Sequence, residues 1–277
     1  MPMLKEALSD LFTKEEISFL SSAFDVIGDI AIIKIPEELE NRESDIADQI
    51  LLRMKNVRTV LKQASNVDGE FRTRGVKFIA GERKFETVYK ESGCLFKVNV
   101  ATVYFSPRLS TERERIASLV LDGEHIFNMF AGLGTFSIIA AKKKKCTVES
   151  VDKNPEAISY ANESLNLNKK LKGTVNPILA DAQEFARNHP LAFDRILMPL
   201  PEKSFEFLST AFDSAKPDAT IHYYTHVSQE YFEDDSWIER HLGEAHLGRN
   251  YSVKNWKRVR EVGPRFIQAV ADIVVLS

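Results

Sequence analysis

The chain has 277 residues, of which 44% are hydrophobic and 28% charged, a composition typical of a globular protein with about two modest domains. No apolar run approaches the ~20 residues that cross a bilayer, and Lys5 and Glu6 interrupt the stretch where a signal peptide would be apolar. Cys94 and Cys146 have no metal-ligand spacing, which excludes a disulfide framework or a structural zinc site. We therefore expect a cytoplasmic protein without a metal and without membrane association.

Charge is distributed unevenly along the chain. Residues 1–50 hold 4 basic and 12 acidic side chains, whereas residues 51–115 hold 14 basic and 7 acidic ones. A phosphate backbone responds to a local basic patch, and not to the global net charge of −3. Residues 51–115 are therefore a candidate nucleic-acid-binding region, although charges scattered over a solvated surface would give the same count.

Short elements of mixed type follow one another in the first part of the chain. Apolar residues at helical spacing predict an N-terminal helical segment over residues 1–22. Beyond it, the order of helix and strand patterns predicts an α+β domain over residues 23–115. The expected elements are strands at 30–35, 57–61, 77–80, 87–89 and 94–100, a helix at 44–54, and a linking helix at 112–119.

From residue 116 to residue 277 strands and helices alternate regularly. This rhythm predicts a mostly parallel sheet covered on both faces, the doubly wound, Rossmann-like α/β architecture. Gly263-Pro264 joins the last two strands, which we expect to form an antiparallel pair. The expected strands are 125–129, 147–151, 175–179, 195–198, 220–224, 254–262 and 266–276, and the expected helices are 136–143, 155–166, 182–187, 204–211 and 228–242.

The first strand of this domain runs into a glycine loop, Phe130-Ala-Gly132-Leu-Gly134. Ligands of doubly wound sheets bind at the carboxyl ends of the strands, where the strand order reverses. Glycines lack a Cβ atom, so this loop can turn tightly and approach a ligand closely. A simple strand-to-helix turn would also contain such glycines, so the loop alone indicates only a candidate cofactor site.

Two acidic residues narrow the choice of cofactor. Asp152 ends the next strand, where a carboxylate can accept hydrogen bonds from both hydroxyls of a ribose. Asp181 and Ala182 end the third strand and are placed to meet an adenine amino group. A dinucleotide loop would carry a third glycine for the pyrophosphate, but Ser137 stands there. We therefore predict S-adenosylmethionine as the cofactor, in a class I methyltransferase domain.

Several segments in both domains together resemble one known family, the archaeal and eukaryotic-type tRNA (guanine-37-N1)-methyltransferases, which are related to the wybutosine-pathway aminocarboxypropyltransferases. The resemblance covers roughly residues 20–277. Members often carry a further N-terminal domain that grips the tRNA, and this chain is expected to lack it. The segments that carry the resemblance are Phe24–Asp29, Gly69–Arg74, Tyr104–Arg113, Phe130–Gly134, Val151–Pro155, Met198–Pro201 and Ile221–Tyr224.

The resemblance implies a reaction on tRNA and a role for individual residues. Guanine N1 must lose its proton to attack a methyl group, and the family pattern gives Glu112 the role of general base. It gives Arg72 the role of stabilising the charge that develops on guanine O6. Tyr104, Arg108 and Arg113 are expected to line the cofactor and target pocket. The remaining expected contacts are Lys153 and Pro199 with the cofactor, and Arg74 and Pro201 with the substrate.

This sequence departs from the family pattern at two positions. Asn128 stands where Asp is common, which would weaken one polar contact of the cofactor loop. Pro199 stands where many members have Asn, and proline offers neither a side-chain amide nor a backbone N–H to orient the target base. His222, within an apolar strand, is expected to be a satisfied core residue.

The alternatives to guanine N1-methylation keep either the tRNA or the cofactor. A wyosine-pathway enzyme would C-methylate the tricyclic precursor at the same tRNA position, or transfer the 3-amino-3-carboxypropyl group of the same cofactor. An RNA-binding protein without activity would keep the fold alone, although Glu112, Arg72 and Asp152 argue against it. A small-molecule methyltransferase would leave the basic region 51–115 unexplained. With tRNA as the partner, and no protein partner evident, we expect a monomer.

Overall fold

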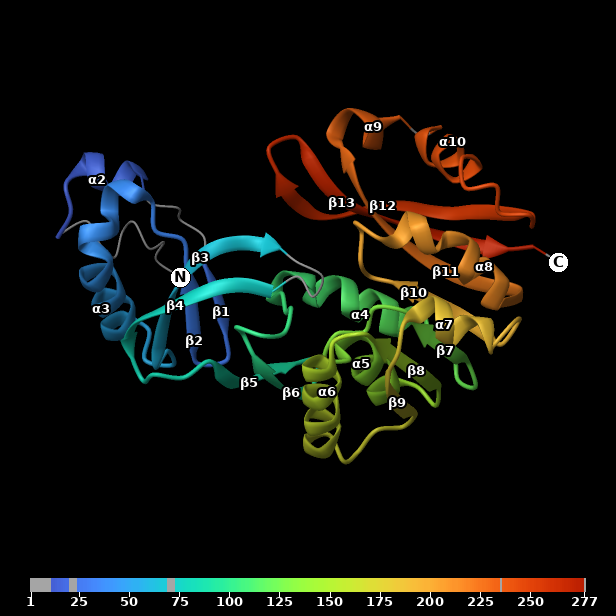
Figure 1. Ribbon diagram of the computed structural model, residues 1–277, viewed down its shortest axis with the longest axis horizontal. Helices are drawn as coiled ribbons and strands as arrows, with labels where there is room; N and C mark the ends of the chain where they lie inside the picture. Colours follow the sequence, from blue (N-terminus) through green and yellow to red (C-terminus); the bar gives the residue numbers. More distant parts are fainter. Residues whose placement is uncertain (1–10, 20–23, 69–72, 235, 277) are drawn as a thin grey trace. The chain divides into compact units, whose positions relative to one another are not determined.

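A computed structural model describes residues 11–19, 24–68, 73–234 and 236–276. The chain divides into two compact units, Met1–Pro107 and Arg108–Ser277 (Figure 1). The division falls eight residues before the expected boundary at 115, because helix α4 (Ser110–Leu119) packs on helix α5 (Thr135–Lys143) and so belongs to the second unit. Of the expected N-terminal helical segment, the described part contains α2, Lys14–Phe19.

The first unit is built on a four-stranded sheet in the order β1-β2-β3-β4 (Figure 1). Helix α3 buries Ile46, Ala47 and Ile50 in the core beside this sheet, as its apolar spacing predicts. The α+β character is therefore confirmed. The elements are β1 Asp25–Ile27, β2 Ile30–Ile33, the 3₁₀ helix Glu37–Arg42, α3 Glu43–Arg53, β3 Thr59–Asp68, β4 Thr73–Gly81, and the hairpin strands β5 Glu86–Glu91 and β6 Cys94–Asn99.

A tight turn at Gly28 joins β1 to β2. The sequence predicted no strand before residue 30, but strand β1 lies at residues 25–27 and pairs antiparallel with β2. Gly28 has φ +58°, and a Cβ atom at this position would lie 2.2 Å from Thr87 Oγ1. Only glycine fits this turn without strain, which gives a structural reason for one segment of the family resemblance.

The second unit contains a seven-stranded sheet in the order β12-β13-β11-β10-β7-β8-β9 (Figure 1). Strand β13 runs antiparallel to β11 and β12, and the remaining neighbours are parallel. The doubly wound sheet with an antiparallel final pair is therefore confirmed. Its strands are β7 His125–Asn128, β8 Thr147–Asp152, β9 Thr174–Leu179, β10 Phe193–Met198, β11 Ala215–Ser228, β12 Tyr251–Gly263 and β13 Phe266–Val275.

Helices connect these strands much as expected. Asn154 caps α6 by accepting hydrogen bonds from the N–H groups of Glu156 and Ala157, so the helix begins at residue 155 as expected. The single helix expected over residues 228–242 is instead two helices, with Asp234 accepting hydrogen bonds from Ser236 between them. The helices are α5, α6 Pro155–Leu167, α7 Ala182–Arg187, the 3₁₀ helix Ser204–Phe207, α8 Leu208–Ser214, α9 Gln229–Glu233 and α10 Trp237–Gly243.

None of the helices in the described ranges is long and apolar enough to cross a membrane.

Candidate active site

The glycine loop lies where the strand order of the second unit reverses. β10 pairs with one side of β7, and β8 pairs with the other, so the end of β7 is the switch point of the sheet. Gly132 has φ +54° and Gly134 has φ +77°, left-handed conformations that favour glycine. Helix α5 begins directly after Gly134. The glycine loop therefore lies at the position where a doubly wound sheet binds its ligand.

Asp152 at the end of β8 closes the loop from one side. One of its carboxylate oxygens accepts a hydrogen bond of 2.6 Å from the Gly132 N–H, and the other accepts one of 2.9 Å from Asn154 N–H. Burial raises the pKa of Asp152, and the backbone hydrogen bonds partly oppose that rise. The carboxylate is thus positioned by the loop itself, with acceptor capacity left for a ribose diol.

Lys153 and Asp181 follow the carboxyl ends of the neighbouring strands β8 and β9. Asp181 caps helix α7, because its Oδ1 accepts hydrogen bonds from the N–H groups of Gln183 and Glu184. Its other oxygen lies 3.5 Å from Lys153 Nζ. Ala182, the first residue of α7, is buried. Asp181, which is predicted to contact the adenine, therefore also caps helix α7.

Asn128 is fully buried beneath the loop. Its amide nitrogen donates to Ser137 Oγ at 3.1 Å, and Ser137 Oγ lies 2.9 Å from Ser150 Oγ. In the described part of the chain, no group donates a hydrogen bond to Asn128 Oδ1. A buried acceptor without a donor is unfavourable by about 1–3 kcal/mol, so this oxygen is suited to accept from a bound ligand. The substitution of the usual Asp thus leaves an acceptor in place.

Glu112 on helix α4 is held by a tyrosine of strand β11 and by an arginine of its own helix. Tyr224 on β11 donates a hydrogen bond of 2.7 Å to Glu112 Oε1. Arg115 donates to both oxygens, at 2.7 Å to Oε1 and 2.9 Å to Oε2. Burial and the Glu112 carboxylate raise the pKa of Tyr224 well above its usual range, so the hydroxyl stays protonated and remains a donor.

Tyr224 also joins Glu112 to the cofactor loop. The Tyr224 ring lies edge-on to the ring of Phe136, with 6.2 Å between the ring centroids. Phe136 is the second residue of α5, two residues after Gly134. The structure therefore brings the predicted base to the same side of the sheet as the glycine loop, although more than 20 residues separate them in sequence.

The other predicted residues are placed as follows. Phe130 lies edge-on to Phe207, with ring centroids 5.0 Å apart, next to the loop. Arg113 is buried and Arg108 is exposed, while Pro199 is half-buried and Pro201 buried after β10. Tyr104 is half-buried and belongs to the first unit. Arg72 lies outside the described residues, as does the side chain of Arg74.

Two functional features were missed in the sequence. The first is the anchoring of Glu112 by Arg115 and Tyr224, since nothing in the local sequence pairs α4 with β11. The second is a basic edge: residues 249–265 hold six Lys or Arg and one Glu, and β12 is an edge strand of the sheet. A local charge count extended beyond residue 115 would have found the second feature.

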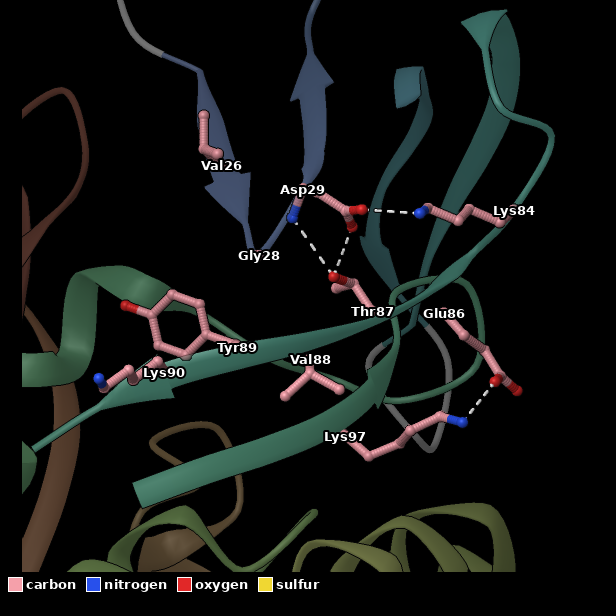
Figure 2. Close-up of a pocket in the computed structure, with 10 residues that line it drawn as sticks. All are labelled: Val26, Gly28, Asp29, Lys84, Glu86, Thr87, Val88, Tyr89, Lys90 and Lys97. Carbon is pink, nitrogen blue, oxygen red and sulfur yellow. Dashed lines mark hydrogen bonds and ion pairs between the residues drawn. The ribbon is translucent and has the colours of Figure 1, made fainter. Parts of the chain in front are cut away.

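A hollow of about 920 Å³ lies in the first unit and contains none of the predicted residues (Figure 2). Asp29 is fixed there by Lys84 at 2.7 Å and by the Thr87 hydroxyl at 2.7 Å. Partial burial disfavours the charge of Asp29, but these hydrogen bonds outweigh it and lower its pKa. Lys90 and Lys97 also line the hollow. Its walls are the Gly28 turn and the β5–β6 hairpin, so this polar hollow is distinct from the glycine-loop site.

The seven-stranded order, the switch-point loop with two glycines, and the acidic residue ending the second strand define a class I methyltransferase domain. Residues 87–246 match the model of the TRM5/TYW2 methyltransferase domain, and residues 4–84 match that of the TYW2 N-terminal domain. The chain belongs to the TRM5/TYW2 methyltransferase family, which confirms the resemblance seen in the sequence.

Named relatives include methyltransferases that act on two different bases at position 37. Trm5b, a tRNA (guanine(37)-N(1))-methyltransferase of Pyrococcus abyssi, is 46% identical over 74% of this chain and 60% of its own length. Taw21, a tRNA 4-demethylwyosine(37)-methyltransferase of Saccharolobus solfataricus, is 35% identical over 90% of this chain and 92% of its own length. The chain thus spans only about 60% of the first relative but nearly all of the second.

Solved structures agree with this assignment. The crystal structure of Pyrococcus abyssi Trm5b has a TM-score of 0.85 at 39% identity, covering 96% of this chain and 79% of that one. The complex of aTrm5 and tRNALeu has a TM-score of 0.84 at 32% identity, covering 100% and 78%. Pyrococcus horikoshii TYW2 in complex with MeSAdo has a TM-score of 0.76 at 26% identity, covering 99% and 98%.

Proposed function

We propose that this protein transfers the methyl group of S-adenosylmethionine to N1 of guanine 37 in tRNA. The observation that carries the proposal is the link from Glu112 through Tyr224 to Phe136, since it holds a candidate base beside the cofactor loop. The relatives named as tRNA (guanine(37)-N(1))-methyltransferases support the substrate and the atom. Because the chain spans about 60% of the first of them, the activity is our inference.

The residues around the glycine loop fit the proposed cofactor. Asp152 offers its carboxylate to the ribose hydroxyls, Asp181 lies where the adenine would meet the sheet edge, and Asn128 Oδ1 is a buried acceptor for an ammonium group. When bound, S-adenosylmethionine supplies a methyl group on a positively charged sulfur. The MeSAdo complex of the Pyrococcus horikoshii relative supports a ligand of this chemical type.

Glu112 is the proposed general base. The N1–H proton of guanine would pass to its carboxylate, which frees the nitrogen lone pair for attack on the methyl carbon. Oε1 already accepts two hydrogen bonds, whereas Oε2 accepts one, from Arg115, among the described residues. Oε2 therefore has the greater remaining capacity to accept the proton. Arg72 is the proposed cation at guanine O6, and its role rests on the family resemblance.

Two basic regions support tRNA as the substrate. The first is residues 51–115, already noted in the sequence. The second is the edge strand β12, where Lys257 pairs with Val270, which in turn pairs with Tyr224. Directly paired residues point to one face of a sheet, so Lys257 lies about 10 Å from Tyr224 on the face that carries Glu112. We further expect the protein to act as a cytoplasmic monomer.

Nucleoside mass spectrometry of treated tRNA tests the proposal. An unmodified transcript with G37 should yield 1-methylguanosine, and the same transcript with A37 should yield none. Cofactor labelled on the methyl carbon should transfer its label, whereas label in the aminocarboxypropyl chain should not enter the RNA. If only the label of the aminocarboxypropyl chain enters the RNA, the reaction is aminocarboxypropyl transfer and not methylation.

The length match with Taw21 favours one second candidate, C-methylation of the tricyclic wyosine precursor at the same tRNA position. The observation that favours it over guanine N1-methylation is the alignment over 92% of Taw21, against 60% of Pyrococcus abyssi Trm5b. It would use the same cofactor site and the same face of the sheet. Parallel assays on G37 tRNA and on tRNA that carries 4-demethylwyosine separate the two candidate functions. If the second candidate is correct, only the tRNA with 4-demethylwyosine gains a methyl group.

A further inference from the structure

A continuous chain of buried and half-buried polar and charged side chains ends at Glu112. It begins at Glu124, whose two oxygens accept hydrogen bonds of 2.7 and 2.8 Å from Arg195 on β10. Arg195 also lies 2.6 Å from Nε2 of His222, whose Nδ1 lies 2.6 Å from Asp272 on β13. The chain then passes to α4 through Arg115, which bonds Asp272 at 2.7 and 3.1 Å and Glu112 at 2.7 and 2.9 Å.

Sheet pairing fixes this order. His222 on β11 is directly paired with Asp272 on β13, and Arg195 on β10 lies on the other side of β11. Asn255 on β12 donates a further hydrogen bond of 3.1 Å to Asp272. Asp272 is therefore approached by Arg115 and by groups from both neighbouring strands, all on the face of the sheet that α4 covers.

The protonation states follow from the donors. A guanidinium can only donate, so Arg195 requires Nε2 of His222 to be an acceptor, and Nδ1 must carry the proton that Asp272 accepts. Burial lowers the pKa of His222, which agrees with a neutral ring. Burial disfavours the charge of Asp272, but hydrogen bonds from His222 and Arg115 outweigh it and hold its pKa well below the usual range.

The charge balance of this chain bears on the base. Three carboxylates (Glu112, Glu124 and Asp272) face two guanidiniums (Arg115 and Arg195), and the imidazole is neutral. The set thus carries one net negative charge, and a proton on Glu112 neutralises it. Without Asp272, the whole charge of Arg115 would act on Glu112 and hold it in the ionised form, which opposes proton uptake.

We propose that Asp272 is a positioning residue for the reaction: it shares the guanidinium of Arg115 with Glu112, so that Glu112 is held in place and still accepts the N1 proton of guanine. The proposal deepens, and rests on, the proposed function of Glu112 as general base. The Tyr224 hydroxyl also donates a hydrogen bond to Glu112 Oε1, but it brings no charge to the carboxylate.

The test is the nearly isosteric change Asp272→Asn. Turnover on G37 tRNA should fall roughly tenfold, a fraction of the ~10²–10⁴-fold that a general base contributes. The acid limb of the pH–kcat profile should move to lower pH, while KM for tRNA and the Kd for S-adenosylmethionine stay within about twofold. A loss of turnover with an unchanged pH profile would overturn the proposal, because misfolding alone lowers activity without moving the profile.

Glu124→Gln is the matched control. It removes the same charge from the far end of the chain, with Arg195 and His222 between it and Asp272. It should reduce thermal stability as Asp272→Asn does but leave the acid limb in place. Equal shifts of the profile in the two variants would contradict a specific role for Asp272.

Carboxyl-¹³C NMR of glutamate-labelled protein separates this proposal from the function on which it rests. The Glu112 signal, assigned by its loss in Glu112→Gln, should titrate at lower pH in Asp272→Asn than in the unchanged protein. If the titration shifts but no tRNA is methylated, the proposed function is wrong and the electrostatic coupling stands. If tRNA is methylated and neither titration nor profile shifts, the role of Asp272 is wrong.

Discussion

The two halves of the seven-stranded sheet bury polar groups in different ways. On the β7–β8 side, the buried polar groups under the glycine loop are small and neutral: Asn128, Ser137 and Ser150. On the β10–β13 side they are charged, with Arg195 and Asp272 each in contact with His222. Buried charges stabilise a fold only as a complete set and often less than apolar side chains of the same size. The concentration of paired charges on the β10–β13 side is explained if Glu112, at the end of the set, does chemistry.

The largest expected effect is that of Glu112→Gln, at the reactive end of the charged half. An amide has nearly the same shape but cannot take the N1 proton, so turnover should fall by about 10²–10⁴-fold. Cofactor affinity should stay nearly unchanged, because the glycine loop and Asp152, which we propose to bind the cofactor, lie at β7 and β8 and do not contact Glu112. Single-turnover methyl transfer and calorimetry with S-adenosylmethionine measure the two quantities. Turnover close to that of the unchanged protein would remove Glu112 as the base.

Arg195→Met tests whether the charged half stabilises the fold only as a set. The change leaves Glu124 and the Nε2 acceptor of His222 without their donor, and breaking a buried pair in this way costs about 3–5 kcal/mol of unfolding free energy. Lys216→Met is the control, since its pair with Asp194 at 2.8 Å leaves 40% and 34% of the two side chains exposed and should contribute at most about 1 kcal/mol. Urea unfolding that gives equal losses for both variants would contradict the distinction.

Asp152→Asn probes the neutral half, where binding and not proton transfer is expected. The amide loses the charge that Gly132 N–H and the ribose hydroxyls share, a loss of about 2 kcal/mol or roughly 30-fold in the Kd of S-adenosylmethionine. The control is Glu149→Gln on the same strand, where the carboxylate bonds His125 and Asn176 and not the loop. Calorimetry should find cofactor affinity unchanged in the control; a comparable loss in both variants would point to general damage of β8.

A pH series on the unfolding free energy distinguishes the neutral His222 from its charged neighbours. Burial lowers the pKa of His222, so the folded protein keeps the ring neutral while the unfolded chain binds a proton below about pH 6.5. The neutral ring therefore contributes to the free energy of unfolding above that pH. As the pH falls below it, this contribution is lost by about 1.4 kcal/mol per pH unit. His222→Gln should flatten the slope between pH 6.5 and 5.5. An unchanged slope would mean that the ring is charged in the fold.

The same contrast explains what could be read from the sequence. The glycine loop, Asp152 and the N-cap Asn154 depend on residues close in sequence, and their patterns predicted the fold and the cofactor site. Glu112 is bonded by Tyr224 of β11, and its other partner Arg115 is bonded by Asp272 of β13; both strands lie more than 100 residues later and are brought there by the fold and not by local pattern. The role of Glu112 could therefore be reached only through the family resemblance. His222 was correctly expected to be a satisfied core residue, but its partners were not foreseeable.

The smallest expected effect concerns Lys257 on the basic edge β12, next to the charged half. If its ammonium contacts one phosphate of the tRNA, Lys257→Ala should lower the slope of log affinity against log salt by about 0.7–0.9. Between 50 and 200 mM salt, the unchanged protein should thus lose roughly 2.6- to 3.5-fold more affinity than the variant. Lys170→Ala, an exposed lysine just before β9 at the opposite edge, should keep the full slope. If the two slopes are the same, the tRNA does not pass along β12, and the basic edge serves only to keep an open strand from pairing with other chains.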